Sequence, residues 1–351
     1  MNPPVFDEAK WRKETASVNP ALLYAPHFAD DVFYNPWMPM EKHGFTRLLR
    51  WKFSSKDAYT EKEKILKANL IPDLNERINM TSKTDFIAWI GHATFLIRAG
   101  GEYWLTDPMF SDRALLPKRL IPPALSLEET SKLKGKLNII VSHNHYDHLD
   151  KASIRGLPDN SRVFAPLGLG KYIEGISSKK VTAMDWWQEY ELGNGVKIVC
   201  LPAQHWSRRI SQGANKALWA SFLLITPNVT IYYGGDSGYF AGFKEIGRVY
   251  PKIDYALMPI GAYRPRWFMH YAHMNIDEAL DAFSDLAARY FIPTQWGTFQ
   301  LGDEPAGYPI LDLKRTIKQT GFDSTKAIIM EPGQIIHFPS EVENQTGKTS
   351  P

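Results

Sequence analysis

Short apolar runs bounded by glycine, asparagine or aspartate recur along the chain from residue 85 onward. Such runs are typical of buried β-strands, because the turn residues end them before a helix could complete several turns. They predict strands at residues 86–90, 94–98, 103–106, 137–142, 197–201, 220–226, 230–233, 256–260 and 291–294. Gly91-His92 and Gly100-Gly101 separate the first three runs, which favours tightly turned antiparallel strands.

Two stretches predict helices instead. Residues 126–133 open with Ser126 and Glu129, which have the spacing of a capping box. Residues 276–289 place apolar side chains on one face, and Asn275 precedes them as an N-cap. Strands that come first, followed by a mixture of strands and helices, predict an α/β fold in which helices cover a sandwich of sheets.

The first 80 residues show a different pattern. Residues 35–40 are rich in proline and aromatic side chains, and residues 60–67 are rich in charge. This composition predicts an irregular arm that ends in one amphipathic helix and has little core of its own. We therefore expect an N-terminal arm at 1–80, packed on the core or facing a membrane, one folded domain at 81–340 and a disordered tail at 341–351.

Composition narrows the class of protein. The 351 residues carry 41 Lys and Arg against 38 Asp and Glu, a net charge of +3 that is too small for a chain that mainly binds nucleic acid. The single cysteine, Cys200, excludes an intramolecular disulfide, and with no secretory signal or transmembrane stretch it favours the cytoplasm. Ten histidines beside one cysteine mean that a transition metal would be bound through imidazole and carboxylate.

Four candidate metal ligands follow the predicted strand at 137–142. Within six residues the chain presents His143, His145, Asp147 and His148. Three imidazoles and a carboxylate at a buried strand end would repel and desolvate one another without a cation. The two histidines separated by one residue can converge on one ion, and the adjacent Asp-His pair can reach a second. The alternative is a solvated loop with chance histidines.

Two more candidates follow later strands. His205 comes after the predicted strand at 197–201, and Asp236 comes after the strand at 230–233 in a Gly-Gly-Asp-Ser-Gly turn. A lone histidine after a strand is more often structural than a ligand. The order of these residues and their shared position at strand ends favour metal binding for both.

The H-x-H-x-D-H signature at 143–148 resembles that of the metallo-β-lactamase superfamily. A longer series of segments resembles the N-acyl-phosphatidylethanolamine-hydrolysing phospholipase D family, in order from about residue 35 to beyond 302: 89–94, 105–108, 166–169, 185–187, 204–206, 259–269 and 296–299. The resemblance implies an αββα sandwich of the metallo-β-lactamase type, two zinc ions, a homodimer and hydrolysis of a phosphodiester in a membrane phospholipid.

The resemblance also implies a role for each candidate ligand. The first ion would be bound by the histidines at 143, 145 and 205, and the second by the Asp-His pair at 147–148, with Asp236 bridging the two. One position departs from the family, because Gln295 stands where the pattern has a histidine ligand of the second ion. A Gln carbonyl is a weaker donor to zinc than imidazole, so we expect a labile second ion or a different divalent metal. A purely hydrogen-bonding role for Gln295 is the alternative.

The family reaction implies roles around these ligands. Metal-bound hydroxide would attack phosphorus, with Asp147 and Asp236 orienting it or passing its proton. His273 would contact the phosphate at the entrance, although on its own it reads as a surface or helix-entry histidine. The products would be phosphatidic acid and an N-acylethanolamine.

Supporting residues are predicted at positions near these motifs. Asp107 follows a strand and precedes Pro108, a position from which it could accept a hydrogen bond from a ligating imidazole. His92 is expected either to support a ligand in a similar way or to form a structural hydrogen bond. Arginines near the motifs could bind the substrate phosphate, and a solvated or ion-paired role is the alternative for at least two of them. These arginines are Arg208, Arg209, Arg264 and Arg266.

Membrane contact and activity leave alternatives open. Residues 47–53 and 115–121 interleave basic, apolar and aromatic side chains, as an interfacial segment does, but either could pack on the domain or on a second subunit. The expected partners are a phospholipid substrate and a second copy of the chain, with any membrane contact peripheral and no nucleic acid. Two other readings are a hydrolase of a soluble phosphodiester, ester or lactone, and a metal-impaired lipid-binding pseudoenzyme, suggested by Gln295.

Overall fold

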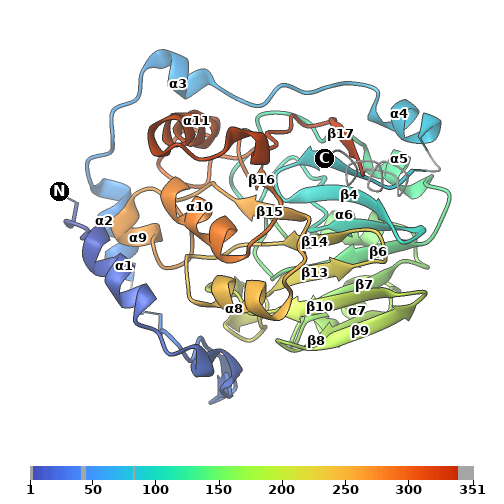
Figure 1. Ribbon diagram of the computed structural model, residues 1–351, viewed down its shortest axis with the longest axis horizontal. Helices are drawn as coiled ribbons and strands as arrows, with labels where there is room; N and C mark the ends of the chain where they lie inside the picture. The colour runs from blue at the N-terminus through green and yellow to red at the C-terminus, as the bar shows by residue number, and fades with distance from the viewer. Residues whose placement is uncertain (1–2, 41–44, 82–83, 339–351) are drawn as a thin grey trace, which may run out of the picture.

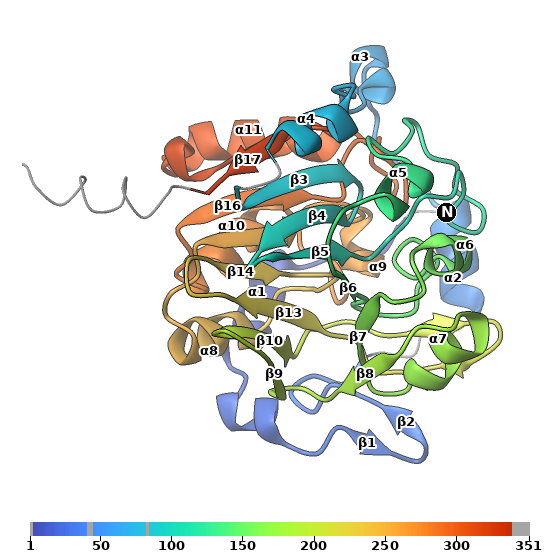
Figure 2. The same ribbon diagram turned by 90° about the vertical axis from the view of Figure 1, so that its right-hand side faces the viewer.

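Two β-sheets pack face to face in the computed structural model, with helices on the outside of both (Figure 1, Figure 2). The structure describes residues 3–40, 45–81 and 84–338, so the predicted tail at 341–351 lies outside the described residues. The predicted αββα sandwich is confirmed.

The first sheet has seven strands in the order β17-β3-β4-β5-β6-β7-β8. They are β3 (Phe86–Gly91), β4 (Thr94–Ala99), β5 (Glu102–Thr106), β6 (Leu137–Ile140), β7 (Arg162–Pro166), β8 (Val181–Met184) and β17 (Ile335–His337). The first three strands in sequence pair antiparallel, as expected, and β5 to β8 run parallel. The carboxyl ends of β5 and β6 therefore meet at one edge of this sheet.

The second sheet has six strands in the order β16-β15-β14-β13-β10-β9. They are β9 (Glu189–Gly193), β10 (Val196–Leu201), β13 (Ser221–Ile225), β14 (Thr230–Tyr233), β15 (Tyr255–Pro259) and β16 (Tyr290–Thr294). Strands β14, β15 and β16 run parallel, so their carboxyl ends also share one edge. A separate hairpin, β11 (Arg208–Arg209) with β12 (Gly213–Ala214), follows β10.

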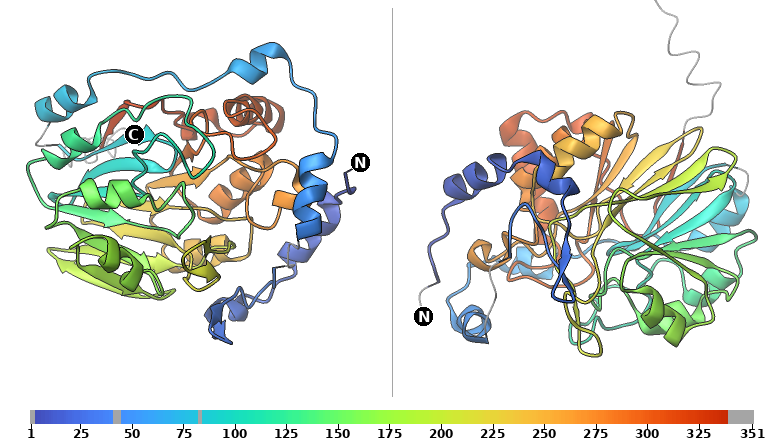
Figure 3. Two further views of the ribbon diagram at one scale, coloured as in Figure 1. Left: turned by 180° about the vertical axis from the view of Figure 1, so that it is seen from behind. Right: turned by 90° about the horizontal axis from the view of Figure 1, so that it is seen from below.

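Helices cover the outer face of each sheet, and Figure 3 shows the two sets on opposite sides of the paired sheets. The helices beside the seven-stranded sheet are α5 (Leu127–Ser131), α6 (Lys151–Gly156) and α7 (Gly170–Ile176). Those beside the six-stranded sheet are α8 (Gly242–Val249), α10 (Ile276–Asp285) and α11 (Tyr308–Thr320). In the part of the chain that the structure describes, no helix is long and apolar enough to cross a membrane.

Burial on both faces explains why the strands read as continuous apolar runs. In β3, Ile87 and Trp89 belong to the core that joins the two sheets, whereas Phe86, Ala88 and Ile90 belong to a second core that includes residues of α6 and α7. A strand buried on both faces shows no polar alternation, so its length and flanking turn residues are the usable signal. The turn after β4 needs Gly100 and Gly101, whose φ angles are 63° and 80°.

Both predicted helices form, but each ends earlier than expected. The capping boxes of Ser126 with Glu129 and of Asn275 with Glu278 are both present. Helix α10 ends at Asp285 and not at residue 289, because the chain turns at Ala287, where φ is 50°, to enter β16. Strands β7, β8, β9 and β17 and helices α6, α7, α8 and α11 were not predicted.

The N-terminal arm contains more structure than the single helix that its sequence predicts. It forms α1 (Glu8–Ala16), the 3-10 helix η1 (Pro20–Tyr24), the hairpin of β1 (Phe28–Ala29) and β2 (Val32–Phe33), α2 (Phe45–Phe53), α3 (Glu61–Ile65) and α4 (Leu74–Met80). Trp11 of α1 is buried against Tyr271 and donates from Nε1 to Glu278 at 2.9 Å. Elements this short are stabilised by packing on the rest of the chain, which their own sequence pattern does not show.

Candidate metal centre

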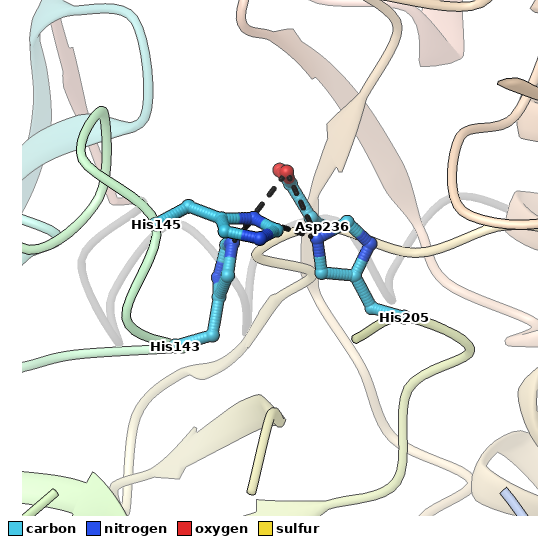
Figure 4. A group of neighbouring side chains, drawn as sticks. All are labelled: His143, His145, His205 and Asp236. Carbon is cyan, nitrogen blue, oxygen red and sulfur yellow. Dashed lines mark hydrogen bonds and ion pairs between the residues drawn. The ribbon is translucent and has the colours of Figure 1, made fainter. Parts of the chain in front are cut away.

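The predicted ligands meet because each follows the end of a strand. The segment with His143 and His145 follows β6 of the seven-stranded sheet. His205 follows β10 and Asp236 follows β14, both in the six-stranded sheet. Figure 4 shows the two histidines of the first loop facing the later histidine and the carboxylate. The site therefore lies between the two sheets.

The first ligand group is compact and almost entirely buried. One ligand atom from each of His143, His145, His205 and Asp236 lies within 4.8 Å of the other three. His145 Nδ1 is 2.8 Å from His143 Nε2 and 3.1 Å from His205 Nε2. Asp236 Oδ2 lies 3.7 Å and 3.6 Å from the same two Nε2 atoms. Three imidazoles and one carboxylate aimed at one point form a donor set that suits a zinc-like ion.

Burial keeps these three histidines neutral. It lowers the pKa of His143 and of His205 well below the usual value, and neighbouring imidazoles lower that of His143 further. Burial also lowers the pKa of His145, to about 4. At pH 7 each ring therefore has a free lone pair, which is the form that binds a metal ion.

A second group lies beside the first and shares Asp236. His148 Nε2 is 3.1 Å from Asp236 Oδ1 and 3.3 Å from Asp147 Oδ2. Burial alone would lower the pKa of His148, but the carboxylates of Asp236, Asp147 and Asp107 raise it well above the usual value. Burial alone would raise the pKa of Asp147 and of Asp236, but His148 lowers both well below the usual range. The carboxylates thus favour a positive charge beside His148 Nε2, which is the electrostatic environment that a bound cation needs.

The orientation of the ligands fits metal binding. His148 Nε2 is buried and forms no hydrogen bond, although two carboxylate oxygens lie close to it. His145 Nε2 is also buried without a partner. A cation between the carboxylates and His148 Nε2 would satisfy an atom that the protein leaves unpaired. The residues present therefore fit two divalent ions that share Asp236.

Asp107 holds His148 in this orientation, which agrees with its predicted supporting role. Its Oδ2 accepts from His148 Nδ1 at 2.6 Å and also from the hydroxyls of Ser142 and Tyr233. Its Oδ1 accepts from the backbone N–H of Ser142 at 2.6 Å. His205 is fixed in the same way, because its Nδ1 lies 3.1 Å from the carbonyl of Ala272. Such outer contacts set the tautomer, so that the other ring nitrogen faces the metal.

Arg209 plays a structural part that the sequence did not reveal. Its Nη1 donates to the carbonyls of Asn144 and Leu149, both at 2.9 Å, and its Nε donates to Tyr172. Its guanidinium also stacks on Tyr146 at 4.2 Å. Arg209 thereby joins both ends of the loop that bears the first histidines. Tyr233 was missed as well, and its position two residues before Gly235 at a strand end is the only signal that could have indicated it.

Gln295 lies at the site but presents its amide nitrogen. Nε2 donates to Asp236 Oδ1 at 2.6 Å and to the carbonyl of Gly235 at 2.9 Å. An N–H group has no lone pair to offer a metal. The hydrogen-bonding alternative for Gln295 is thus the arrangement that the structure has.

The remaining predicted residues lie at different distances from the ligands. The ring of His273 is 5.4 Å from that of His205, and its Nδ1 is buried without a partner. Arg266 pairs with Glu8 and Glu278 and donates to the carbonyl of His273 at 3.1 Å.

Two other arginines are placed at the periphery. Arg264 pairs with Asp57 of the arm, and Arg208 is exposed on the β11 hairpin. Phosphate binding by Arg208, Arg264 and Arg266 stays a prediction, because Arg264 and Arg266 form ion pairs with acidic side chains of the protein itself.

Comparison with known proteins identifies the class. Residues 103–296, more than half of the chain, match the family model described as the β-lactamase superfamily domain. The fold is similar to that of a metallo hydrolase from Ignicoccus hospitalis, with a TM-score of 0.56 at 22% identity over 74% of this chain and 100% of that one. The fold and the ligand groups define a metal-dependent hydrolase of the metallo-β-lactamase superfamily.

Curated relatives narrow this class. The chain is 37% identical to N-acyl-phosphatidylethanolamine-hydrolysing phospholipase D 1 of Caenorhabditis elegans, over 68% of this chain and 72% of the nematode protein. It is 33% identical to the mitochondrial enzyme of that name from Saccharomyces cerevisiae, over 69% of this chain and only 53% of the yeast protein. A metal-dependent hydrolase of Caldivirga maquilingensis is 29% identical, over 72% of this chain and 98% of its own. The chain belongs to the N-acyl-phosphatidylethanolamine-hydrolysing phospholipase D family.

Proposed function

We propose that this protein is a zinc-dependent phosphodiesterase of the phospholipase D type that hydrolyses N-acyl-phosphatidylethanolamine-like lipids. The observation that carries the proposal is the pair of ligand groups that share Asp236, in a chain 37% identical to a relative named for this activity. Water would add to phosphorus, and the bond from phosphorus to the oxygen of the N-acylethanolamine would break. Phosphatidic acid keeps the water oxygen, and the leaving alcohol takes the proton.

Zinc suits the donor set. Imidazole and carboxylate are the ligands that zinc takes in hydrolases, and the first group offers three of one and one of the other. When bound, two such ions act as Lewis acids that neutralise phosphoryl charge and make water nucleophilic near pH 7.

The protein's own groups orient the reaction. Asp147 and Asp236 are the carboxylates that lie beside the unpaired Nε2 of His148, so we assign them to orienting the attacking water or accepting its proton. His273 lies beside His205, and its unpartnered Nδ1 could hydrogen-bond a phosphate oxygen. Burial lowers the pKa of His273, so it would act as a neutral hydrogen-bond donor.

Exposed apolar side chains on α2 and on two loops support peripheral contact with a membrane. Phe53 on α2, Leu116 and Ile210 are 69%, 77% and 84% exposed. The loop of Leu116 is tied to the site because the N–H of Leu120 donates to the carbonyl of Thr298 at 2.8 Å, and the hydroxyl of Thr298 accepts from the N–H of His92. The N–H of Ile210 lies 3.3 Å from the hydroxyl of Tyr146, on the loop of the metal ligands. Apolar tips beside an active site suit a lipid substrate that does not leave its bilayer.

The position of Gln295 favours one alternative function, that of a metal-impaired lipid-binding pseudoenzyme. Because its amide nitrogen faces Asp236, this position supplies no imidazole to the second group. A chain that binds one ion or none would be a lipid-binding pseudoenzyme. Elemental analysis separates the two, since two tightly held zinc ions per chain would exclude the impaired reading.

The test compares two substrates with two proteins. Wild type and His145→Ala are incubated with N-acyl-phosphatidylethanolamine in mixed vesicles and with a soluble bis-aryl phosphodiester, and products are identified by mass spectrometry. We expect wild type to release phosphatidic acid and an N-acylethanolamine. Loss of one first-group ligand should lower kcat/KM by about 100- to 1,000-fold, the loss typical when one group that stabilises transition-state charge is removed.

Three outcomes decide between the readings. Full activity in His145→Ala would refute the metal mechanism. Hydrolysis of the soluble ester alone would favour the hydrolase of a small phosphodiester. Lys197→Ala, which changes a half-buried strand residue paired with Glu189 and placed outside the metal centre, is the control and should keep wild-type rates.

A further inference from the structure

His92 is a buried imidazole at the edge of the metal centre. It follows β3, its side chain is fully buried, and its φ angle is 52°, a value that only strong local contacts maintain in a residue other than glycine. Its backbone N–H donates to Thr298 Oγ1 at 3.1 Å, and its carbonyl accepts from the N–H of Gln295 at 3.2 Å. His92 is therefore held directly beside the position that departs from the family.

The separations around His92 resemble those of a coordination shell. His92 Nε2 lies 3.2 Å from Asp147 Oδ2. His148 Nε2 lies 3.3 Å from the same Asp147 oxygen and 3.1 Å from Asp236 Oδ1. Two ligand atoms on one tetrahedral zinc, each at about 2.0–2.1 Å, lie about 3.3 Å apart. The three separations are close to this value, and His92, Asp147 and His148 each offer a ligand atom within 4.8 Å of the other two. Asp236 joins this group through its contact with His148.

A direct hydrogen bond explains the contact of His92 with Asp147 less well. Charge-assisted N–H···O bonds are usually about 2.7–2.9 Å long. Two other histidine–carboxylate hydrogen bonds occur among the described residues. The bond from His148 to Asp107 is 2.6 Å long and that from His27 to Asp185 is 2.7 Å long, so neither exceeds the lower end of this range. At 3.2 Å, His92 and Asp147 are spaced like two ligands and not like a donor and its acceptor.

Gln295 leaves the second group in need of a ligand. Both of its recorded side-chain contacts are donations from Nε2, to Asp236 and to the carbonyl of Gly235. That arrangement fixes the shared carboxylate but gives no lone pair to an ion. Without another donor the second group would have one imidazole and two carboxylates.

We propose that His92 is the fourth ligand of the second metal ion, which is then bound by His92, Asp147, His148 and Asp236. Gln295 acts as the hydrogen-bond donor that holds Asp236 in place. With His92 the second site has two imidazoles and two carboxylates, which is the number of ligands that a four-coordinate zinc ion takes. This inference rests on the two-metal site of the proposed function, and it does not depend on which substrate is hydrolysed.

His92→Gln separates a ligand from a hydrogen-bond donor. The glutamine amide can still donate to Asp147, but it binds zinc poorly. Holoprotein is equilibrated at a series of buffered free zinc concentrations, and bound zinc per chain is measured by elemental analysis. We expect two ions in wild type, and in His92→Gln one tight ion with a second bound at least about 100-fold more weakly. The double variant His92→Gln/Gln295→His should recover the second ion, because it returns an imidazole to the adjacent position.

The controls keep the result decisive. Gln295→His alone should retain two ions, and circular dichroism checks that each variant is folded. X-ray absorption of wild-type zinc protein gives a second measurement that needs no variant: five imidazoles for two ions if His92 binds, four if it does not. Two tight ions in His92→Gln, a single ion in saturated wild type, or an imidazole count of four would each overturn the proposal. Because no substrate is used, inactivity toward the lipid would leave it intact.

Discussion

Single residues outside the ligand set determine how the ligands are aimed. Asp107 accepts four hydrogen bonds in a fully buried position, from Ser142 twice, from Tyr233 and from His148. Arg209 acts similarly on the backbone of the loop that carries the ligands, where it donates to two carbonyl groups. Each restricts the orientations that the histidine side chains of this loop could otherwise adopt.

Arg209→Lys should loosen the loop of the metal ligands. Lysine cannot donate in a fork to the carbonyls of Asn144 and Leu149, and leaving a buried carbonyl unpaired costs about 1–3 kcal/mol. We expect about 10- to 100-fold weaker metal binding, measured by competition with a chelator. Arg155→Lys is the control, because Arg155 also donates to a backbone carbonyl but on the exposed surface of α6. Equal metal affinity in the two variants would contradict the proposed part of Arg209.

The sequence predicts the ligands but not what orients them, for a physical reason. His143, His205 and Asp236 each stand three or four residues beyond the end of a strand, and a run that ends at a sheet edge places nearby polar residues there. Arg209 and Tyr233 act through contacts with Leu149 and Asp107, residues about 60 and 126 positions away in the chain. Periodicity reports only on neighbours along the chain, so contacts of this kind need the fold.

At the scale of elements, the segment after β16 is fixed by a buried carboxyl group. Glu304 accepts from the backbone N–H groups of Tyr263 and Arg264 at 2.9 Å and 3.1 Å. Burial raises the pKa of Glu304 from 4.5 to about 7, although these hydrogen bonds act in the opposite direction. The loop after β15 is thus tied to the loop after β16 by a group that titrates near neutral pH.

The elevated pKa of Glu304 predicts a loss of stability as pH rises. Between pH 4.5 and about 7 the folded chain holds a proton that the unfolded chain releases, so the free energy of unfolding falls across this window. The full effect is about 3 kcal/mol, since one pKa unit corresponds to about 1.4 kcal/mol. Urea unfolding at pH 5 and pH 8 should show a smaller difference in Glu304→Gln than in wild type. Glu76→Gln, an exposed change on α4, is the control, and the same pH difference in both variants would refute the role of Glu304.

The elements of the N-terminal arm could be predicted least well. Its helices are short and depend on partners far along the chain, as Trp11 does on Glu278. The sandwich itself was predictable because most of its strands are apolar runs that can be recognised from their own sequence. Strand β9 shows the opposite case, since most of its side chains are exposed at the sheet edge and leave little apolar signal.

At the scale of the whole molecule, the metal centre joins the two sheets. The loop after β6 belongs to the seven-stranded sheet, whereas His205 and Asp236 follow strands of the six-stranded sheet. An ion bound by all of them links two surfaces that otherwise associate through apolar packing. Metal binding should therefore stabilise the fold as well as serve the reaction.

Removal of the metal should lower the melting temperature. At a free zinc concentration about 100 times the Kd, one bound ion adds about 2.7 kcal/mol to the free energy of unfolding. For a chain of this size a loss of that order lowers Tm by roughly 3–5 °C. Calorimetry before and after treatment with EDTA, followed by return of zinc, measures the change. His145→Ala should respond less to both treatments, and an unchanged Tm in wild type would show that the ions do not join the sheets.

The order of the strands also divides the chain into two consecutive halves. Strands β3 to β8 complete one sheet apart from β17. Strands β9 to β16 form the other, apart from the separate β11–β12 hairpin, and only residues 185–188 lie between the two sets. Each half carries an incomplete set of ligands. A chain cut between β8 and β9 and expressed as two fragments would therefore assemble around zinc, and fragment complementation would then report on metal binding without any substrate.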